Sequence, residues 1–428
     1  MAEWKPTRLQ DVGVRLIDCV HKTPEAQPIG YPYVGIPQMK NGRIDFTTAR
    51  LISREDYLEW TKKAKPQKYD VILSRRTNPG VTAIDDTGTE FALGQNLVLL
   101  RADGTQVYAP FLKWMALSPY WWEQIAKFNN VGAVFDSLKC ADVPNFELPV
   151  PPHDTQKLIA DMLGALDDKI ELNRRMNETL EAMARAIFKD WFVDFGPTRA
   201  KMEGRSPYLA PDIWSLFPDT LDEDGKPAGW NAGALSDVAS LNPESWSRAA
   251  YPEAVDYVDL SNTKWGTIEA ITLYASEAAP SRAQRILRPG DTILGTVRPG
   301  NGSYAFVSAN GLTGSTGFAV LRPKDQIFRE VVYLAATAKE NIDRLAHLAD
   351  GGAYPAVRPE LVAATELVAA PESLFAAFSA TTSALFDRAE ANKQEISTLA
   401  ATRDFLLPKL MSGEIRVRDA EKAVEATV

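Results

Sequence analysis

The chain carries the same series of sequence signals twice, about 220 residues apart. The first copy has Tyr-Val-Gly-Ile at residues 33–36 and Pro-Gly at 79–80, and the second has Tyr-Val-Asp-Leu at 257–260 and Pro-Gly at 299–300. Two copies of this length indicate duplicated domains and not a solenoid. A duplicated chain can place two similar modules about a pseudo-twofold axis, which suits a target that has two halves.

Each copy predicts a mixed α/β domain, because short apolar runs alternate with turn signals and one longer helical pattern. The first copy predicts strands at 71–73 and 97–100 and a helix at 111–127 that is interrupted around Pro119. The second copy predicts strands at 255–260, 292–295 and 317–321 and a helix at 331–348.

A 4-3 spacing of apolar residues follows each domain for about forty residues, which is the signature of a coiled coil. The interface positions are Ile159, Leu163, Leu166, Ile170, Asn173, Leu180 and Ile187 in the first segment and Phe378, Leu385, Asn392, Ile396, Leu399 and Leu406 in the second. Two such segments in one chain most simply pair with each other, antiparallel, with one globular domain at each end. Pro408 is expected to end the second helix early, because proline lacks an N–H and clashes with the preceding turn.

Asn173 and Asn392 lie near the middle of the two predicted helices. They could meet near the pseudo-dyad and fix the register of the helix pair at some cost in stability. Alternatively, each could face water at a loose point in the seam.

These signals divide the chain into six segments. They are a first domain at 1–151, a helix at 152–195, a linker at 196–229, a second domain at 230–371, a helix at 372–412 and a tail at 413–428. The linker is rich in Pro and Gly and acidic, with Trp214 and Phe217 expected to be pinned to a surface. The charged tail is expected to fray.

The net charge of −9 argues against a free-standing nucleic-acid binder, although an acidic chain can still bind DNA through a local basic face or beside a basic partner. With only Cys19 and Cys140, a disulfide framework is not expected and a reducing cytosol fits. No run reaches the roughly 18 to 20 apolar residues that span a bilayer, and the N-terminus has no apolar signal core. A cytoplasmic protein without a membrane partner is therefore expected.

Motifs for catalysis are missing from the sequence. His21, His153 and His347 lie far apart, and none has a Cys/His spacing suited to zinc. The Gly-rich runs at 299–302 and 311–317 lack the lysine of a phosphate-binding loop, so we interpret them as hairpin turns and a loop at the sheet edge. The sequence therefore predicts no catalytic residue and no metal site, which argues against a self-sufficient nuclease or methyltransferase.

Recognition features are better represented, because a polar loop recurs after a strand in both copies. Arginine can pair with guanine and asparagine with adenine, and either can hold phosphate. The candidate DNA-binding residues are Lys40, Arg75, Arg76, Thr77 and Asn78 in the first copy and Lys264, Thr296, Arg298 and Asn301 in the second. The alternative is a solvated turn with surface salt bridges, and for Lys40 and Lys264 simple turn solubility is an equal possibility.

Two helical motifs resemble a known family. Residues 166–173 (Leu-Asp-Asp-Lys-Ile-Glu-Leu-Asn) and 188–195 (Phe-Lys-Asp-Trp-Phe-Val-Asp-Phe) resemble the central conserved region of type I restriction–modification specificity subunits. Residues 406–415 (Leu-Leu-Pro-Lys-Leu-Met-Ser-Gly-Glu-Ile) resemble the distal conserved region. The order of variable half and conserved helix, repeated, spans essentially the whole chain. The recognition halves of this family vary freely, so no contact residue carries over.

The resemblance implies an α+β fold with two pseudo-symmetric mixed α/β target recognition domains, separated by two long helices that form an antiparallel coiled coil. Each domain would read one half of a bipartite, asymmetric target in double-stranded DNA. The helices would set the spacer and dock two modification (methyltransferase) subunits that carry S-adenosylmethionine. Restriction subunits, the translocase and endonuclease with their ATP and Mg²⁺, would join that core. This chain would hold no cofactor and catalyse nothing. The alternative is a duplicated coiled-coil scaffold that binds only proteins, which the acidic charge favours.

Overall fold

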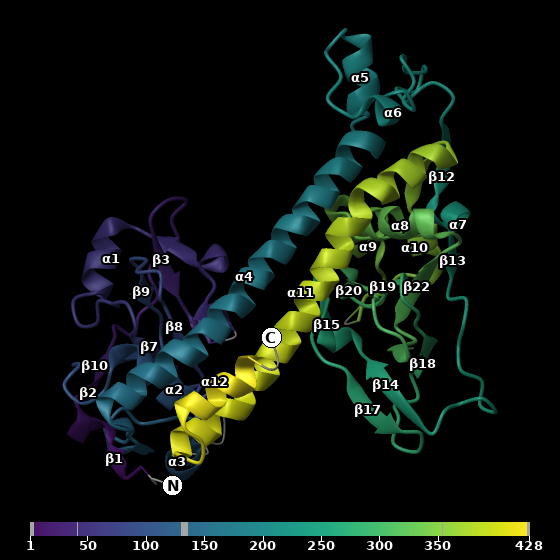
Figure 1. Ribbon diagram of the computed structural model, residues 1–428. Helices are drawn as coiled ribbons and strands as arrows, with labels where there is room; N and C mark the ends of the chain where they lie inside the picture. Colours follow the sequence, from purple (N-terminus) through teal and green to yellow (C-terminus); the bar gives the residue numbers. More distant parts are fainter. Residues whose placement is uncertain (1–3, 41, 130–135, 353, 426–428) are drawn as a thin grey trace. The chain divides into compact units, whose positions relative to one another are not determined.

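The computed structural model describes residues 4–40, 42–129, 136–352 and 354–425. The chain divides into two compact units, residues 1–173 with 395–428 and residues 174–394. Each unit combines one globular domain with part of each of two long helices, α4 (His153–Phe192) and α11 (Glu372–Ser412) (Figure 1).

The first unit is built on a six-stranded sheet with smaller sheets beside it. The large sheet has the order β2 (Val14–Asp18), β10 (Leu97–Ala102), β7 (Val71–Ser74), β8 (Thr82–Ile84), β5 (Arg43–Ile44) and β4 (Met39–Lys40). The smaller sheets are β6 (Arg50–Ile52), β3 (Tyr31–Val34), β9 (Ala92–Leu93) and the pair β1 (Pro6–Arg8), β11 (Glu147–Pro149). The short helices of its globular domain are α1 (Arg54–Trp60), α2 (Leu112–Leu117) and α3 (Pro119–Phe128).

The interruption expected around Pro119 is confirmed. Helix α2 ends at Leu117, and Ser118 caps α3 because its hydroxyl accepts a hydrogen bond from the Trp121 N–H at 3.4 Å. Pro119 occupies the first turn of α3, where its missing N–H costs nothing.

The second unit contains two four-stranded sheets. One has the order β13 (Ala239–Leu241), β22 (Phe318–Pro323), β19 (Thr292–Gly295), β20 (Tyr304–Phe306), and the other β17 (Thr272–Ala275), β14 (Ala254–Val258), β21 (Leu312–Ser315), β18 (Ala283–Ile286). Two ribbons, β12 (Asn231–Ala234) with β23 (Glu366–Ala369) and β15 (Thr263–Lys264) with β16 (Thr267–Ile268), complete the strands described. The helices are α5 (Gly196–Met202), α6 (Pro211–Trp214), α7 (Leu235–Val238), α8 (Arg329–Ala336), α9 (Lys339–Leu348) and α10 (Pro359–Ala363).

The duplication seen in the sequence is present in the strand pairing. Strand β3 pairs in parallel with β9, with Tyr33 opposite Ala92, and β14 pairs in parallel with β21, with Tyr257 opposite Thr313. A matched ion pair also recurs. Arg101 donates from Nε and Nη2 to the Asp70 carboxylate at 2.8 and 2.6 Å, and Arg322 donates from the same atoms to Asp291 at 2.8 Å each.

Two expectations for the second domain are wrong. Residues 311–317 are not an edge loop, because they contain β21, which lies between β14 and β18. Gly314 lets β21 pack closely against the Leu287 side chain, since a Cβ at this position would lie 3.2 Å from that side chain. The helix expected at 331–348 is two helices, broken at Thr337 and Ala338, where the Thr337 hydroxyl bonds the Tyr333 carbonyl at 2.7 Å.

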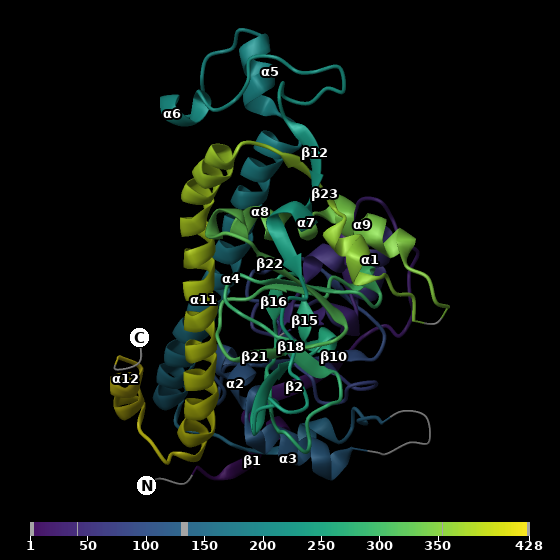
Figure 2. The ribbon, with the colours of Figure 1, turned by 90° about the vertical axis from the view of Figure 1, so that its right-hand side faces the viewer.

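The two long helices are α4 (His153–Phe192) and α11 (Glu372–Ser412), and they run side by side (Figures 1 and 2). In the first unit, Ile159, Leu163 and Leu166 of α4 share a core with Leu406 and Leu410 of α11. In the second unit, the end of α4, from Ala184 to Phe192, shares a core with Phe375, Phe378 and Phe386 near the start of α11. Early α4 therefore meets late α11 and late α4 meets early α11, which confirms the antiparallel pairing.

The expectation that Pro408 ends its helix early is wrong. Pro408 lies inside α11, and Leu406, Leu407, Leu410 and Met411 around it are all buried in the core. Packing of this last turn outweighs one missing backbone hydrogen bond.

The expectation of a frayed tail is also wrong. Residues 417–425 form helix α12, and Val417 and Ala420 are buried in the core of the first unit.

The linker at 196–229 is partly helical and is held by aromatic contacts. Phe217 is buried, with its ring centroid 5.4 Å from that of Trp191 and 6.2 Å from that of Trp230, so the expected anchoring of Phe217 is confirmed. Across the described ranges, no helix is both long and apolar enough to cross a membrane.

Candidate nucleic-acid interface

In the first domain, the polar loop begins where β7 ends. The Arg75 N–H donates to the Asn96 carbonyl at 2.9 Å, and the Arg75 carbonyl accepts from the Leu138 N–H at 2.9 Å. The backbone is thus held on both sides just before it turns at Thr77, which has the left-handed φ of 67°. A β-branched residue with positive φ is a backbone outlier of the kind that gathers at functional sites.

The loop after β19 in the second domain has the same backbone frame. The Thr296 N–H donates to the Gly317 carbonyl at 2.8 Å, and the Thr296 carbonyl accepts from the Val357 N–H at 2.9 Å. Two residues further on, Arg298 takes the left-handed φ of 48°, as Thr77 does in the first loop. Rigid strands thus present two equivalent loops, a common arrangement for binding residues.

The residue whose backbone is hydrogen-bonded on both sides, Arg75 in the first loop and Thr296 in the second, differs between the two copies. Thr296 is buried, and its hydroxyl donates to the Gly317 carbonyl at 2.8 Å, so this predicted contact residue lies inside the domain. Arg75 is half-buried, with Nη2 3.3 Å from Nε2 of His21 and Nη1 3.5 Å from the Leu138 carbonyl.

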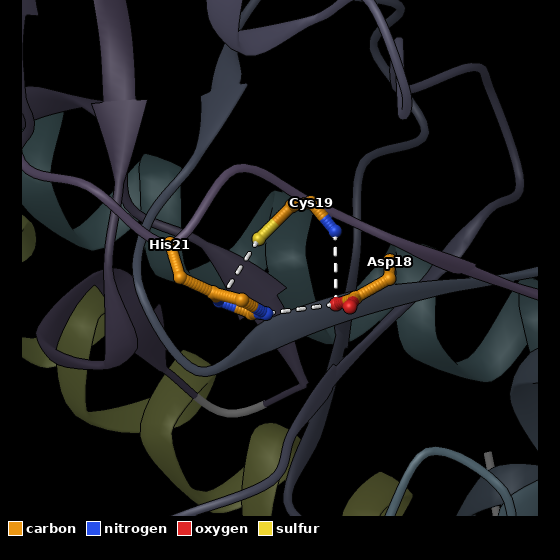
Figure 3. A group of neighbouring side chains, drawn as sticks. All are labelled: Asp18, Cys19 and His21. Carbon is orange, nitrogen blue, oxygen red and sulfur yellow. Dashed lines mark hydrogen bonds and ion pairs between the residues drawn. The ribbon is translucent and has the colours of Figure 1, made fainter.

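His21, which Arg75 contacts, belongs to a cluster with Asp18 and Cys19. Figure 3 shows these three side chains, whose possible metal-ligand atoms lie within 4.8 Å of one another. The Cys19 thiol donates to the Leu97 carbonyl at 2.9 Å, and burial, followed by the charge of Asp18, raises the pKa of Cys19 to about 12. The His21 Nε2 lies 3.0 Å from the Asp18 carboxylate. The protonated Cys19 thiol and the His21 ring suit a hydrogen-bond network that holds Arg75 in place. The positive charge of the Arg75 guanidinium beside them opposes binding of a metal cation.

The other predicted loop residues are exposed. Arg76, Thr77 and Asn78 are open to solvent in the first loop, and Arg298 and Asn301 are open in the second. The Arg298 guanidinium lies 4.9 Å from the centroid of the Tyr354 ring.

The two matched lysines have different surroundings. Lys40 donates to Asp45 at 2.7 Å, and hydrogen bonds from Lys40 first and Thr47 second hold the pKa of Asp45 at about 2. Lys264 is half-exposed and forms no ion pair with any residue that the structure describes.

Two aromatic residues of the second loop region were not predicted. Trp265, next to Lys264, is 60% exposed, and Tyr354, beneath Arg298, is 71% exposed. The available signal was the Trp265-Gly266 pair in a hairpin turn where the first copy has Asn41-Gly42, because tryptophan is unusual at such a position. Asn41 itself lies outside the described residues.

All predicted interface residues of the helix pair are buried or half-buried. Asn173 and Asn392 are fully buried, but the structure gives each a different partner. Asn173 Nδ2 donates to Glu395 at 2.8 Å, and Asn392 Nδ2 donates to Asn177 Oδ1 at 2.8 Å. Neither asparagine faces water, so the interpretation of a solvated seam is wrong.

The family described as type I restriction modification DNA specificity domain matches residues 1–182. The chain is 25% identical over 419 residues to the type I restriction enzyme HindI specificity subunit of Haemophilus influenzae, covering 85% of this chain and 90% of that protein. It is 22% identical over 446 residues to the MjaIX specificity subunit of Methanocaldococcus jannaschii, covering 97% and 94%.

The fold is similar to the crystal structure of a type I restriction–modification S subunit from M. genitalium. The TM-score is 0.53 at 15% identity, over 95% of this chain and 96% of that one. The duplicated domains and the paired helices agree with these matches: over most of its length the chain is similar to specificity subunits of type I restriction–modification systems.

Proposed function

We propose that the two domains read the two halves of a split, asymmetric target in double-stranded DNA. The observation that carries this proposal is the pair of equivalent strand-end loops. Their backbone hydrogen bonds match, from Arg75 and Thr296 to the flanking segments, while their side chains differ. One scaffold with two sets of side chains suits recognition of two different base sequences.

The residues proposed to contact DNA are the exposed ones of these loops, together with the lysines of the neighbouring turns. Arg76 and Asn78 serve the first half-site, and Arg298 and Asn301 serve the second. Asp45 competes with phosphate for Lys40, so Lys264 is the more available of the two lysines.

The paired helices α4 and α11 act in this proposal as the spacer between the half-sites and as the docking surface for two methyltransferase subunits. Restriction subunits then join the complex. S-adenosylmethionine, ATP and Mg²⁺ belong to those partner subunits, and this chain contributes recognition without catalysis. Because partner subunits supply much of the phosphate contact, a specificity subunit can carry a net charge of −9.

The test is single-molecule methylome sequencing of cells that express this chain with its cognate methyltransferase subunit. We expect a split motif with N6-methyladenine in both halves. If partner expression is verified and no new methylated motif appears, the proposal fails for this chain.

A second measurement separates DNA recognition from a scaffold that binds only proteins. The assembled complex should bind a duplex carrying the motif with an affinity that falls steeply with salt, since counterions are released on phosphate contact. A complex that assembles but shows no salt-dependent DNA binding would favour the protein scaffold.

A further inference from the structure

We propose that Trp265 is a DNA-contacting residue whose exposed indole face stacks against bases of the half-site read by the second domain. This inference rests on the proposed function and adds an aromatic contact to the polar ones. It follows from the backbone at Trp265, from how its ring is held, and from its neighbours.

The backbone at Trp265 is unfavourable for tryptophan. Trp265 and Gly266 form the two-residue turn between β15 and β16, with φ of 44° and 87°. Such a turn needs left-handed residues at both positions, for which Asn-Gly is strongly preferred. The first copy has that preferred pair, Asn41-Gly42, at the matched place in its sequence. A bulky residue at positive φ is retained against a local energetic cost, which points to a role for the side chain.

The indole is held in place and open on one side. The backbone N–H of Trp265 donates to the Gly302 carbonyl at 2.7 Å, which ties the turn to Gly302. The indole packs against the same glycine, because a Cβ on Gly302 would lie 2.5 Å from the ring. Glycine at 302 therefore makes room for the ring. Tyr304 supports it edge-on, with centroids 5.9 Å apart. A ring that is fixed before binding and 60% exposed loses little conformational entropy when it stacks.

The neighbours of Trp265 match the chemistry of nucleic acid. Gly302 and Arg298 flank a single turn, Pro299–Asn301, so Arg298 and Asn301 lie within one turn of the indole contact. Arg298 in turn lies over the exposed ring of Tyr354. Cations and an amide beside open aromatic rings are the combination that binds bases and phosphates together.

A carboxylate also lies near this turn. Glu181 approaches Gly266 but is engaged by Arg185 at 2.6 Å. Its charge is thus compensated, and it does not oppose a polyanion at Trp265.

The experiment uses the full chain in complex with its cognate methyltransferase subunits and a duplex that carries the methylated motif. Trp265→Asn restores the preferred Asn-Gly turn, so we expect a melting temperature equal to or above that of the wild type. We expect its affinity for the duplex to be about 5- to 150-fold weaker, the range for loss of one base–aromatic stack. Trp265→Phe should keep most of the affinity. If the Asn variant fails to fold, Trp265→Gly replaces it, since glycine also accepts this φ.

Met202→Gln is the matched control, because Met202 is 53% exposed in α5 and glutamine keeps the helical preference. It should leave DNA affinity unchanged. If the wild type binds DNA and Trp265→Asn binds equally well, this inference fails while the proposed function stands. Loss of assembly with the methyltransferase subunits in Trp265→Asn would overturn it too, by reassigning Trp265 to a protein contact. If the wild-type complex binds no DNA, the proposed function fails first.

Discussion

At the scale of single residues, the two copies keep the same structural ion pair and change the residues on the loops. Asp70 and Asp291 are both buried, and each is gripped by an arginine of the adjacent strand. The loop position that follows β7 or β19 is free to differ, as Arg75 and Thr296 do. The same buried ion pair in both copies thus supports loops whose side chains can differ.

Arg322→Met should be strongly destabilising, because it leaves the Asp291 carboxylate buried without its partner. Breaking such a pair typically costs about 3–5 kcal/mol. Arg288→Met is the matched control, because Arg288 is exposed and pairs with Glu244 at the surface, where loss of one partner costs little. Urea unfolding of the full chain measures both. Equal losses in the two variants would contradict a special role for the buried pair.

Asp45 predicts a pH dependence of stability. Its folded pKa of about 2 lies below the ordinary 3.8, because Lys40 and Thr47 donate to the carboxylate. The contribution of this group to stability is therefore complete above about pH 4 and is lost as the pH falls toward 2. For a partly exposed group we expect about 1 kcal/mol. Asp45→Asn should lower the urea midpoint at pH 6, and its difference from the wild type should shrink below pH 4. A difference that is constant with pH would contradict this.

At the scale of elements, the two buried asparagines of the helix pair invite a direct test. Asn173 and Asn392 each donate one hydrogen bond across the pair, and the Oδ1 atom of each finds no partner among the described residues. We expect the Asn173→Leu/Asn392→Leu double variant to melt at a higher temperature but to lose a unique register, because apolar seams are more stable and less specific.

Circular dichroism gives the melting temperature of that variant, and light scattering with small-angle X-ray scattering gives its oligomeric state and inter-domain geometry. Leu172→Gln is the control, because Leu172 neighbours Asn173 but is 54% exposed. If state and geometry stay those of the wild type, the two asparagines do not set the register.

The sequence predicts correctly those elements whose signals are local and repeated. The heptads of α4 and α11 and the break before Pro119 are of this kind. It failed where tertiary packing decides the outcome. Pro408 stays helical because the leucines around it are buried, and α12 forms because Val417 and Ala420 find a core. The inward side chain of Thr296 could not be read from a loop sequence either, since it depends on Gly317 across the sheet.

At the scale of the whole molecule, the proposed function makes the length of the helix pair set the length of the DNA spacer between the half-sites. Adding one heptad to α4 after residue 173 and one to α11 after residue 394 lengthens each helix by about 10 Å and keeps the seam nearly on one face. We expect the spacer of the methylated motif to grow by about three base pairs, at 3.4 Å per base pair. Methylome sequencing reads this directly. A changed half-site sequence would contradict this role of the helix pair.

The duplication also predicts that recognition is modular. Replacing residues 1–151 with the matching segment of a related specificity subunit should change one half of the methylated motif and leave the other half and the spacer unchanged. Replacing residues 230–371 is the matched control and should change only the other half. The physical reason is that each domain has its own core and holds its own loop. Asn96 and Leu138 bond the backbone of the first loop, and Gly317 and Val357 bond that of the second. If one exchange altered both halves, the two loops would have to read the DNA jointly, and Arg76 and Arg298 could no longer be assigned to separate half-sites.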